Sequence, residues 1–422
     1  MTSSIRLPLH QQIYSLQHEA LINLLATTEN LLIIQDLDGV CMGLVKDPLH
    51  REIEPSYVEA TQSFDGHFFV LTNGEHIGQR GVNGIIERAY PDSPASYLPG
   101  LAAGGVQWQD RSGEVLHPGV SDEELSFLEA VPERIQQRLR QFFSDRPTDL
   151  TPGQLDFCIE ASALDNKASP TANLNTFYEA LGNGHEIYVA LQHEMQALMD
   201  DLLAEATQQG LGDSFFVHYA PNLGRDASGK EIVWFSQGDE SGTTDFQFML
   251  RGAVKEAGVV AILNRYYYQR TGSYPLGPDF NSRQAPHEHL ALVKLVKDNF
   301  DPAHMPLIVG VGDTVTSKMV EEDGQLQAKR GGSDRNFLQL IQDINAFFDQ
   351  GNLVVYIDSS GGELKNRKAL QLAEVDGELK VIEGPCDPRD TSDPLVLNVV
   401  FPGGYRQYCA AFSTAAQRRQ AS

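Results

Sequence analysis

Residues 30–40 read Asn-Leu-Leu-Ile-Ile-Gln-Asp-Leu-Asp-Gly-Val, an apolar run that ends in two acids and a glycine. An apolar run without polar alternation is typical of a strand that is buried on both faces of a parallel sheet. Three further runs of this kind lie at 67–71, 305–311 and 352–357. These runs predict an α/β fold with a parallel sheet, in which ligands bind beyond the carboxyl ends of the strands.

Polar residues stand where the predicted strands end. Asp36 and Asp38 follow the first strand, Thr72 follows the second and Asp313 follows the third. Acids separated by one residue point in nearly the same direction, and Gly39 lets the chain turn sharply around whatever they hold. Carboxylates crowded beside an apolar strand are costly, so we expect either a bound cation or a shared proton. Oxygen ligands of this kind suit Mg²⁺.

The pattern changes between the second and third strands, where long amphipathic helical segments such as 121–143 and 186–208 occur. We expect residues 76–245 to form an inserted α+β cap domain. The core domain then comprises residues 1–75 and 246–422.

Three smaller features complete the expected fold. The runs 215–219 and 231–235 read as two strands of one hairpin. The segment 361–394 is rich in charge, glycine and proline, and we expect loops with a short hairpin there. The tail after Ala415 is expected to be frayed.

Composition excludes several classes of function. The 422 residues contain 32 Lys and Arg against 57 Asp and Glu, which gives a net charge of −25. Nucleic acids and anionic membranes are therefore poor partners, because both require clustered positive charge. No apolar stretch approaches the length of a membrane span, and no signal segment is evident, so a cytoplasmic protein is expected. The four cysteines form no Cys-x-x-Cys pair and indicate neither a zinc site nor a disulfide framework.

The residues Asp36-Leu-Asp-Gly-Val40, Thr72-Asn-Gly74 and Gly312-Asp313 resemble the ordered motifs of the haloacid dehalogenase-like phosphatases. The resemblance implies that Asp36 attacks the phosphorus and that Asp38 protonates the leaving alcohol and then activates water. It also implies that Mg²⁺ is held by Asp36, the backbone carbonyl of Asp38 and Asp313, and that Thr72 and Asn73 bind the phosphoryl oxygens.

Two parts of the motif pattern stay open in the sequence. The family uses a lysine near a helix start after the cap, and Lys255 is our choice, with Arg251 as a close competitor. The family also places a second acid shortly after the residue that corresponds to Asp313, and this sequence lacks it there. Asp334 could replace that acid from a nearby loop, or it could cap the helix that begins around residue 336.

A large cap between the second and third motifs resembles that of sugar-phosphate phosphatases. Nearly the full chain, with residues 35–43, 69–76 and 310–317 carrying the match, resembles the cyanobacterial glucosylglycerol-phosphate phosphatases. This implies hydrolysis of glucosylglycerol 3-phosphate to glucosylglycerol, a compatible solute made under salt stress. An association with the preceding glucosyltransferase is left open. Sugar specificity should come from the cap, and the predicted candidates are Glu75, His76, Arg80, Asn183, His185 and Trp234.

Other functions remain as alternatives at this point. The chain could be a phosphatase for another sugar phosphate, of the sucrose-phosphate type, or a phosphosugar mutase. It could also be a non-catalytic regulator that binds a sugar phosphate, although such a protein has no need of both Asp36 and Asp38. The run Gly310-Val-Gly-Asp313 superficially resembles a dinucleotide-binding turn, but the third glycine of that motif is missing.

Overall fold

The computed structural model describes most of the chain, namely residues 15–78, 80–90, 96–182, 185–226, 229–322, 324–349, 351–364 and 367–421. Its main element is an eight-stranded sheet in the order β18-β15-β12-β1-β2-β3-β4-β5. The strands are β1 (Leu31–Gln35), β2 (Phe68–Leu71), β3 (Gly100–Ala102), β4 (Gln107–Gln109), β5 (Val115–Leu116), β12 (Leu307–Gly312), β15 (Leu353–Ile357) and β18 (Val399–Phe401). The six strands from β18 to β3 pair in parallel, which confirms the predicted α/β class.

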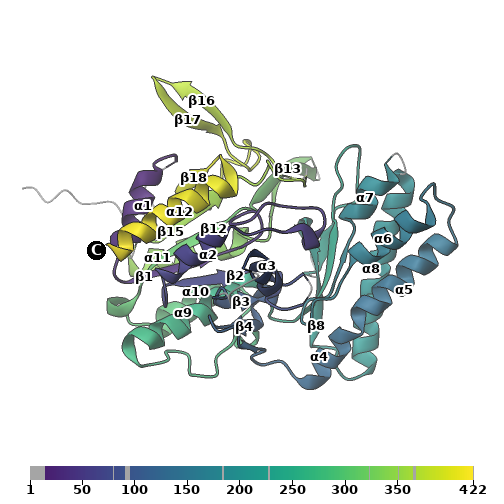
Figure 1. The fold of residues 1–422 in the computed structure, drawn as a ribbon, viewed down its shortest axis with the longest axis horizontal. Helices are drawn as coiled ribbons and strands as arrows, with labels where there is room; N and C mark the ends of the chain where they lie inside the picture. The colour runs from purple at the N-terminus through teal and green to yellow at the C-terminus, as the bar shows by residue number, and fades with distance from the viewer. Residues whose placement is uncertain are drawn as a thin grey trace, which may run out of the picture.

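Strand β1 is fully buried, because helices cover both faces of the sheet (Figure 1). Leu31 and Ile33 pack on one face, against helices α1 (His18–Thr27), α2 (Pro55–Gln62), α3 (Val82–Ala89) and α12 (Gly404–Gln420). Leu32 and Ile34 pack on the other, against α9 (Lys255–Thr271), α10 (His289–Asn299) and α11 (Arg335–Phe348). Short 3₁₀ turns lie at η2 (Pro48–His50), η3 (Ala103–Gly105), η4 (Ser282–Gln284) and η5 (Pro302–His304).

A second sheet of four strands, in the order β6-β7-β11-β8, forms the basis of the cap. Its strands are β6 (Ala163–Leu164), β7 (Thr171–Asn173), β8 (Phe215–Ala220) and β11 (Asp245–Leu250). In β8, Phe215, Val217 and Tyr219 pack into the core of the cap. The cap helices are α4 (Asp122–Glu129), α5 (Val131–Ser144), α6 (Pro152–Ser162), α7 (Asn175–Leu181) and α8 (His185–Gln208), which lie on the side of this sheet away from the main sheet (Figure 1).

Several local predictions need correction. The run 231–235 was expected to pair with 215–219, but β10 (Glu231–Val233) pairs with the intervening β9 (Asn222–Arg225), while β8 pairs with β11. The segment 121–143 is two helices, because Ala130 ends α4 and a proline opens α5.

The C-terminal tail is helical rather than frayed, since α12 continues to Gln420. Arg418 forms an ion pair with Glu19, and Arg419 donates hydrogen bonds to the carbonyls of Leu25 and Thr28, so the end of α12 is tied to α1.

The domain boundaries stay a prediction. Strands β3 to β5 continue the main sheet, although they fall within the range 76–245 expected for the cap. Strand β11 belongs to the cap sheet and extends to Leu250. Because sheet membership changes after Leu116 and again after Leu250, we propose that the inserted unit lies between these two residues.

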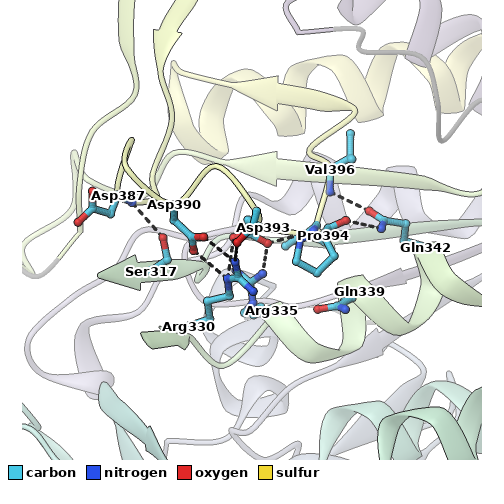
Figure 2. A network of polar contacts seen from close by, with 12 residues as sticks. Ser317, Arg330, Arg335, Gln339, Gln342, Asp387, Asp390, Asp393, Pro394 and Val396 are labelled. Atoms are coloured by element: carbon cyan, nitrogen blue, oxygen red, sulfur yellow. Dashed lines mark hydrogen bonds and ion pairs between the residues drawn. The ribbon is translucent and has the colours of Figure 1, made fainter. Parts of the chain in front are cut away.

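Two hairpins project from the main sheet, β13 (Thr316–Glu322) with β14 (Gln325–Gly331) and β16 (Gln371–Val375) with β17 (Glu378–Glu383). The second one is the hairpin expected within 361–394. The first is held at its base by a polar network that Figure 2 shows, in which Arg330 binds both carboxylate oxygens of Asp390, at 2.5 and 2.8 Å. Arg335 binds Asp393 beside it, so β14 and α11 are both fixed to the segment that precedes β18. Within the described residues, we find no helix long and apolar enough to cross a bilayer.

Candidate active site

The predicted polar residues meet at one edge of the main sheet. Strand β1 lies between β12 and β2, and all three run parallel, so their carboxyl ends are neighbours. Asp36, Thr72 and Asp313 follow these three strands and are almost fully buried, at 6%, 2% and 1% exposure. The topology thus brings together residues that are far apart in the sequence. Asp36 and Asp313, for example, are 277 positions apart (313 − 36).

A buried lysine lies against these acids. Lys255, the first residue of α9, places its Nζ atom 3.0 Å from Oδ2 of Asp36 and 2.6 Å from Oδ1 of Asp334. Arg251, the competing candidate, instead donates hydrogen bonds to the backbone carbonyls of Asp213 and Phe215. Of the two cations, Lys255 alone contacts the acidic residues.

Asp334 belongs to the cluster. Its Oδ2 atom accepts hydrogen bonds from the backbone N–H groups of Asp313 and Thr314, at 2.9 and 3.0 Å, and the side chain is fully buried. It makes no side-chain capping bond to α11, which was the alternative interpretation. The hairpin β13–β14 occupies most of the segment between Asp313 and Asp334 and brings its two ends together. This geometry supports Asp334 as the replacement for the second acid.

Burial controls the electrostatics of the cluster. It raises the pKa of Asp36 well above the ordinary value, although Lys255 opposes the shift. It also raises the pKa of Asp313 to about 6, against the opposing effect of Arg367. The pKa of Asp334 is lowered instead, because the charge and hydrogen bond of Lys255 and the two backbone N–H groups outweigh burial. The negative charges of Asp36 and Asp313 are therefore less well compensated than the charge of Asp334.

The carboxylates fit a hard divalent cation. Asp36, Asp313 and Asp334 each offer an oxygen within 4.8 Å of the others. Both oxygens of Asp334 are already engaged, whereas Oδ1 of Asp36 and Oδ2 of Asp313 are buried without a hydrogen-bond partner among the described residues. The guanidinium of Arg367 lies near Oδ2 of Asp313, with Nε at 3.8 Å. Two buried carboxylate oxygens that accept no hydrogen bond from the described residues are the kind of donor set that Mg²⁺ takes.

Gly39 lets the backbone after β1 pass close to the carboxylates of Asp36 and Asp313. Its φ angle is +78°, and a Cβ atom there would overlap Oδ2 of Asp313. We expect Gly39→Ala to lower kcat by about 10- to 100-fold, because the carboxylate must move away from its position. The backbone strain should also cost about 1–3 kcal/mol of unfolding free energy.

The matched control for this prediction is Gly377→Ala in the turn between β16 and β17. Gly377 has nearly the same φ angle, +80°, but its Cβ would meet nothing within 4 Å. Steady-state kinetics and thermal melts of both variants should show a stability loss in each and a loss of turnover for Gly39→Ala alone. Equal turnover in the two variants would contradict a tight cradle around Asp313.

Asp38 has a partner that the sequence did not indicate. The Nε atom of Arg51 lies 3.1 Å from Oδ1 of Asp38, and its Nη1 atom donates a hydrogen bond of 3.4 Å to the carbonyl of Arg80. The same guanidinium lies beside Gly74 in the loop after β2. Arg51 stands after η2, outside any motif, so no sequence signal distinguished it from other surface arginines.

The loop after β2 forms a tight turn next to the acidic cluster. Thr72 Oγ1 accepts a hydrogen bond of 3.2 Å from the N–H of Gly74, which tightens the turn. Asn73 lines a cavity of about 290 Å³ together with Lys255, His218 and Arg330. This cavity lies between the main sheet and the cap sheet.

The residues predicted to recognise the sugar are placed elsewhere. Glu75 is buried and accepts hydrogen bonds from the backbone N–H groups of residues 167–169, so it joins the main sheet to the cap. His76 is buried, with Nε2 against the carbonyl of Gly100, and Arg80 contacts Asp165 and the carbonyl of Glu160. His185 contacts Ser236, and Asn183 lies outside the described residues. Trp234 lines a neighbouring cavity, which shares Asn222, Gly224, Arg330 and Gly331 with the first one.

Comparison with known proteins gives one consistent family. Residues 30–416 match the family described as glucosylglycerol-phosphate phosphatase. A curated protein of that name from Synechocystis sp. is 61% identical over 417 residues, which cover 98% of this chain and 98% of that protein.

Solved structures are also similar. The C-terminal domain of Candida albicans trehalose-6-phosphate phosphatase matches 98% of this chain and 99% of its own, with 11% identity and a TM-score of 0.46. Trehalose-6-phosphate phosphatase from Aspergillus fumigatus matches 96% of this chain and 98% of its own, with 8% identity and a TM-score of 0.40.

Proposed function

The chain belongs to the glucosylglycerol-phosphate phosphatase family, and on that premise we propose that it hydrolyses glucosylglycerol 3-phosphate to glucosylglycerol and inorganic phosphate. The observation that carries the proposal is the buried cluster of Asp36, Lys255, Asp313 and Asp334 at the carboxyl edge of the sheet. Such a cluster has the parts of a phosphoryl-transfer site: a nucleophile, a cation and a set of oxygen ligands.

Asp36 is the proposed nucleophile. Its carboxylate attacks the phosphorus, the bond to the glycerol oxygen breaks, and Asp38 gives a proton to that leaving oxygen. Water then attacks the aspartyl phosphate while Asp38 takes its proton, which returns Asp36 and releases inorganic phosphate. Lys255, 3.0 Å from Asp36, holds the nucleophile in place and balances charge on the transferring group. Thr72 and Asn73 are the proposed ligands of the phosphoryl oxygens.

Arg51 is the residue that positions Asp38 in this scheme. Its Nε atom lies 3.1 Å from the carboxylate, so the acid is held in one place beside the loop of Thr72. An ion pair at this point also keeps a cation next to the phosphate-binding loop of a strongly acidic protein.

Mg²⁺ is the proposed cofactor. Asp36 Oδ1 and Asp313 Oδ2 would hold it, with the backbone carbonyl of Asp38 as a predicted third ligand. When bound, the ion offsets the carboxylate charges that otherwise repel a phosphate dianion. Asp334 supports the site by fixing Lys255 and the backbone of Asp313.

The cellular setting follows from the same premise. We propose that the protein acts in the cytoplasm, in the synthesis of a compatible solute under salt stress. Association with the preceding glucosyltransferase stays a prediction.

Phosphate release tests the function. We expect the highest kcat/KM for glucosylglycerol 3-phosphate, by about tenfold or more over sucrose 6-phosphate, trehalose 6-phosphate and glycerol 3-phosphate. EDTA should abolish release, and added Mg²⁺ should restore it, because the carboxylates need a cation before they can accept a dianion.

The alternatives give different results in this experiment. A preference for another sugar phosphate would keep the chemistry and change the substrate. Isomeric phosphosugar in place of free phosphate would indicate a mutase. Binding of the sugar phosphates without any turnover would indicate a regulator and contradict the proposal.

A further inference from the structure

The cap sheet has one face that its own helices do not cover. Side chains alternate along β8 and β11, so Val217, Phe246 and Phe248 point into the cap core while their neighbours point the opposite way. On that opposite face, the register places His218, Gln247 and Thr171 side by side across three strands. We call these three residues the cross-strand row.

One member of the cross-strand row, His218, reaches the cavity beside the active site. His218 lines the same cavity of about 290 Å³ as Asn73 and Lys255, which belong to the edge of the main sheet. Figure 1 shows β8 between the main sheet and the cap helices, so the uncovered face of the cap sheet is turned toward the core. A substrate whose phosphate lies at Asp36 therefore has its remaining part next to this face.

The row carries two buried polar atoms without partners. Oε1 of Gln247 and Nε2 of His218 are inaccessible, and neither has a hydrogen-bond partner among the described residues. A buried polar atom left unpaired is costly, so such atoms are rare unless a ligand or water completes them. His218 lines the cavity and Gln247 is its register partner on the neighbouring strand, so the two atoms together point to a binding site.

The surroundings fix the row in place. Glu231 accepts a hydrogen bond of 3.0 Å from Nδ1 of His218, and its other oxygen accepts one of 2.8 Å from the N–H of Tyr219. The imidazole therefore presents Nε2 with a set orientation. Two residues further along β7 and β11, on the same face, Asn173 donates a hydrogen bond of 2.7 Å to Asp245. This pair adds polar groups to the face that carries the row.

We propose that the cross-strand row binds the glycosyl hydroxyls of the substrate, with Gln247 and His218 as the residues that determine specificity. The amide oxygen of Gln247 and the free Nε2 of His218, whose Nδ1–H is given to Glu231, both accept hydrogen bonds, so two neighbouring glycosyl hydroxyls that each donate one proton satisfy them. The proposal rests on the proposed function, because it takes the substrate to be a glycosylated phosphate. It moves recognition away from Trp234, which lines a neighbouring cavity with Lys318 and Lys329, side chains better suited to an anion than to a neutral sugar.

Gln247→Leu tests the proposal through a ratio. The quantity measured is kcat/KM for glucosylglycerol 3-phosphate divided by kcat/KM for glycerol 3-phosphate, which has the phosphate without the sugar. We expect this ratio to fall by about tenfold or more in Gln247→Leu, and also in His218→Leu, because only the glycosylated substrate loses a hydrogen bond. The thermal midpoint of Gln247→Leu should stay equal or rise, since the substitution removes an unpaired buried oxygen.

Two further variants make the test selective. Gln208→Leu makes the same change on the exposed side of α8 and should keep the wild-type ratio. Trp234→Leu should also keep it. An unchanged ratio in Gln247→Leu, or a larger fall in Trp234→Leu, would overturn the inference.

The same experiment distinguishes a wrong substrate assignment from a wrong role of the cross-strand row, because the wild-type protein reports on the first and Gln247→Leu on the second. If the wild-type protein prefers another sugar phosphate and Gln247→Leu loses that preference, the assigned substrate is wrong while the row keeps its role. If the wild-type protein shows no preference for any glycosylated phosphate over glycerol 3-phosphate, both ideas fail together.

Discussion

Asp36→Asn should lower phosphate release by about 10⁴-fold or more, the scale seen when a covalent nucleophile is removed. An amide oxygen is a far weaker nucleophile than a carboxylate, and no other carboxylate can take its place. Asp334 is held by Lys255 and two backbone N–H groups, while Asp313 lies at the end of a different strand.

The same variant should not be less stable than the wild-type protein without metal. Burial and the neighbouring acids raise the pKa of Asp36. The carboxyl of Asp36 is therefore harder to ionise in the folded protein than in the unfolded chain, and stability is lost as the pH rises from the unfolded pKa toward the folded one. Asn removes this cost, so metal-free Asp36→Asn should melt at or above the temperature of the metal-free wild type at pH 7. Added Mg²⁺ should raise the midpoint of the wild type more than that of the variant.

Asp358→Asn is the matched control. Asp358 follows β15 at the same edge of the sheet, but its carboxylate accepts hydrogen bonds from the backbone N–H groups of Ser360 and Leu370. We expect this variant to lose some stability and to keep turnover within about threefold, since it contacts no reacting group. Turnover that survives in Asp36→Asn, or an equal loss in Asp358→Asn, would contradict the assignment of the nucleophile.

The strand ends were predictable because the signal is local. An apolar run of five residues followed by polar ones identifies β1, β2 and β12, and parallel pairing then brings Asp36, Thr72 and Asp313 together. The sequence did not clearly separate Lys255 from Arg251 as the motif cation, because both stand near the start of the same predicted helix. The structure separates them, since α9 begins at Lys255 and the preceding turn carries Arg251 toward the carbonyl of Asp213.

Other parts of the site depend on contacts that sequence spacing does not show. Asp334 was left undecided because 20 residues separate it from Asp313, and only the pairing of β13 with β14 brings them close. Arg51 follows no motif at all. The cross-strand row could not be found either, because the sequence pattern assigned 231–235 as the partner of β8. The actual partner, β11, begins at Asp245, ten positions after that run ends (245 − 235).

Lys255→Met should be costly for both stability and turnover. The lysine is 3% exposed and lies between Asp36 and Asp334, so its loss leaves buried carboxylates without their cation. Breaking a buried ion pair in this way typically costs about 3–5 kcal/mol of unfolding free energy. Turnover should fall by about 10²- to 10³-fold, because one charge that stabilises the transferring phosphoryl group is removed.

A double variant separates the two effects. In Lys255→Met/Asp334→Asn, the asparagine oxygen can still accept the N–H groups of Asp313 and Thr314, and the amide nitrogen stands where the lysine was bound. We expect denaturant unfolding to show that part of the lost stability returns, since one of the two carboxylates that lost the lysine is now neutral. Turnover should stay low, because the cation is still missing.

Arg251→Met serves as the control for this pair of variants, because it removes a cation four residues away that contacts only backbone carbonyls. It should keep turnover within about threefold, as expected for a side chain outside the cluster. If the double variant recovered turnover together with stability, the role of Lys255 would be structural alone. If Arg251→Met lost as much turnover as Lys255→Met, the motif cation would be Arg251. Low turnover with restored stability, together with a smaller loss of turnover in Asp334→Asn alone, is the combination expected of a catalytic lysine.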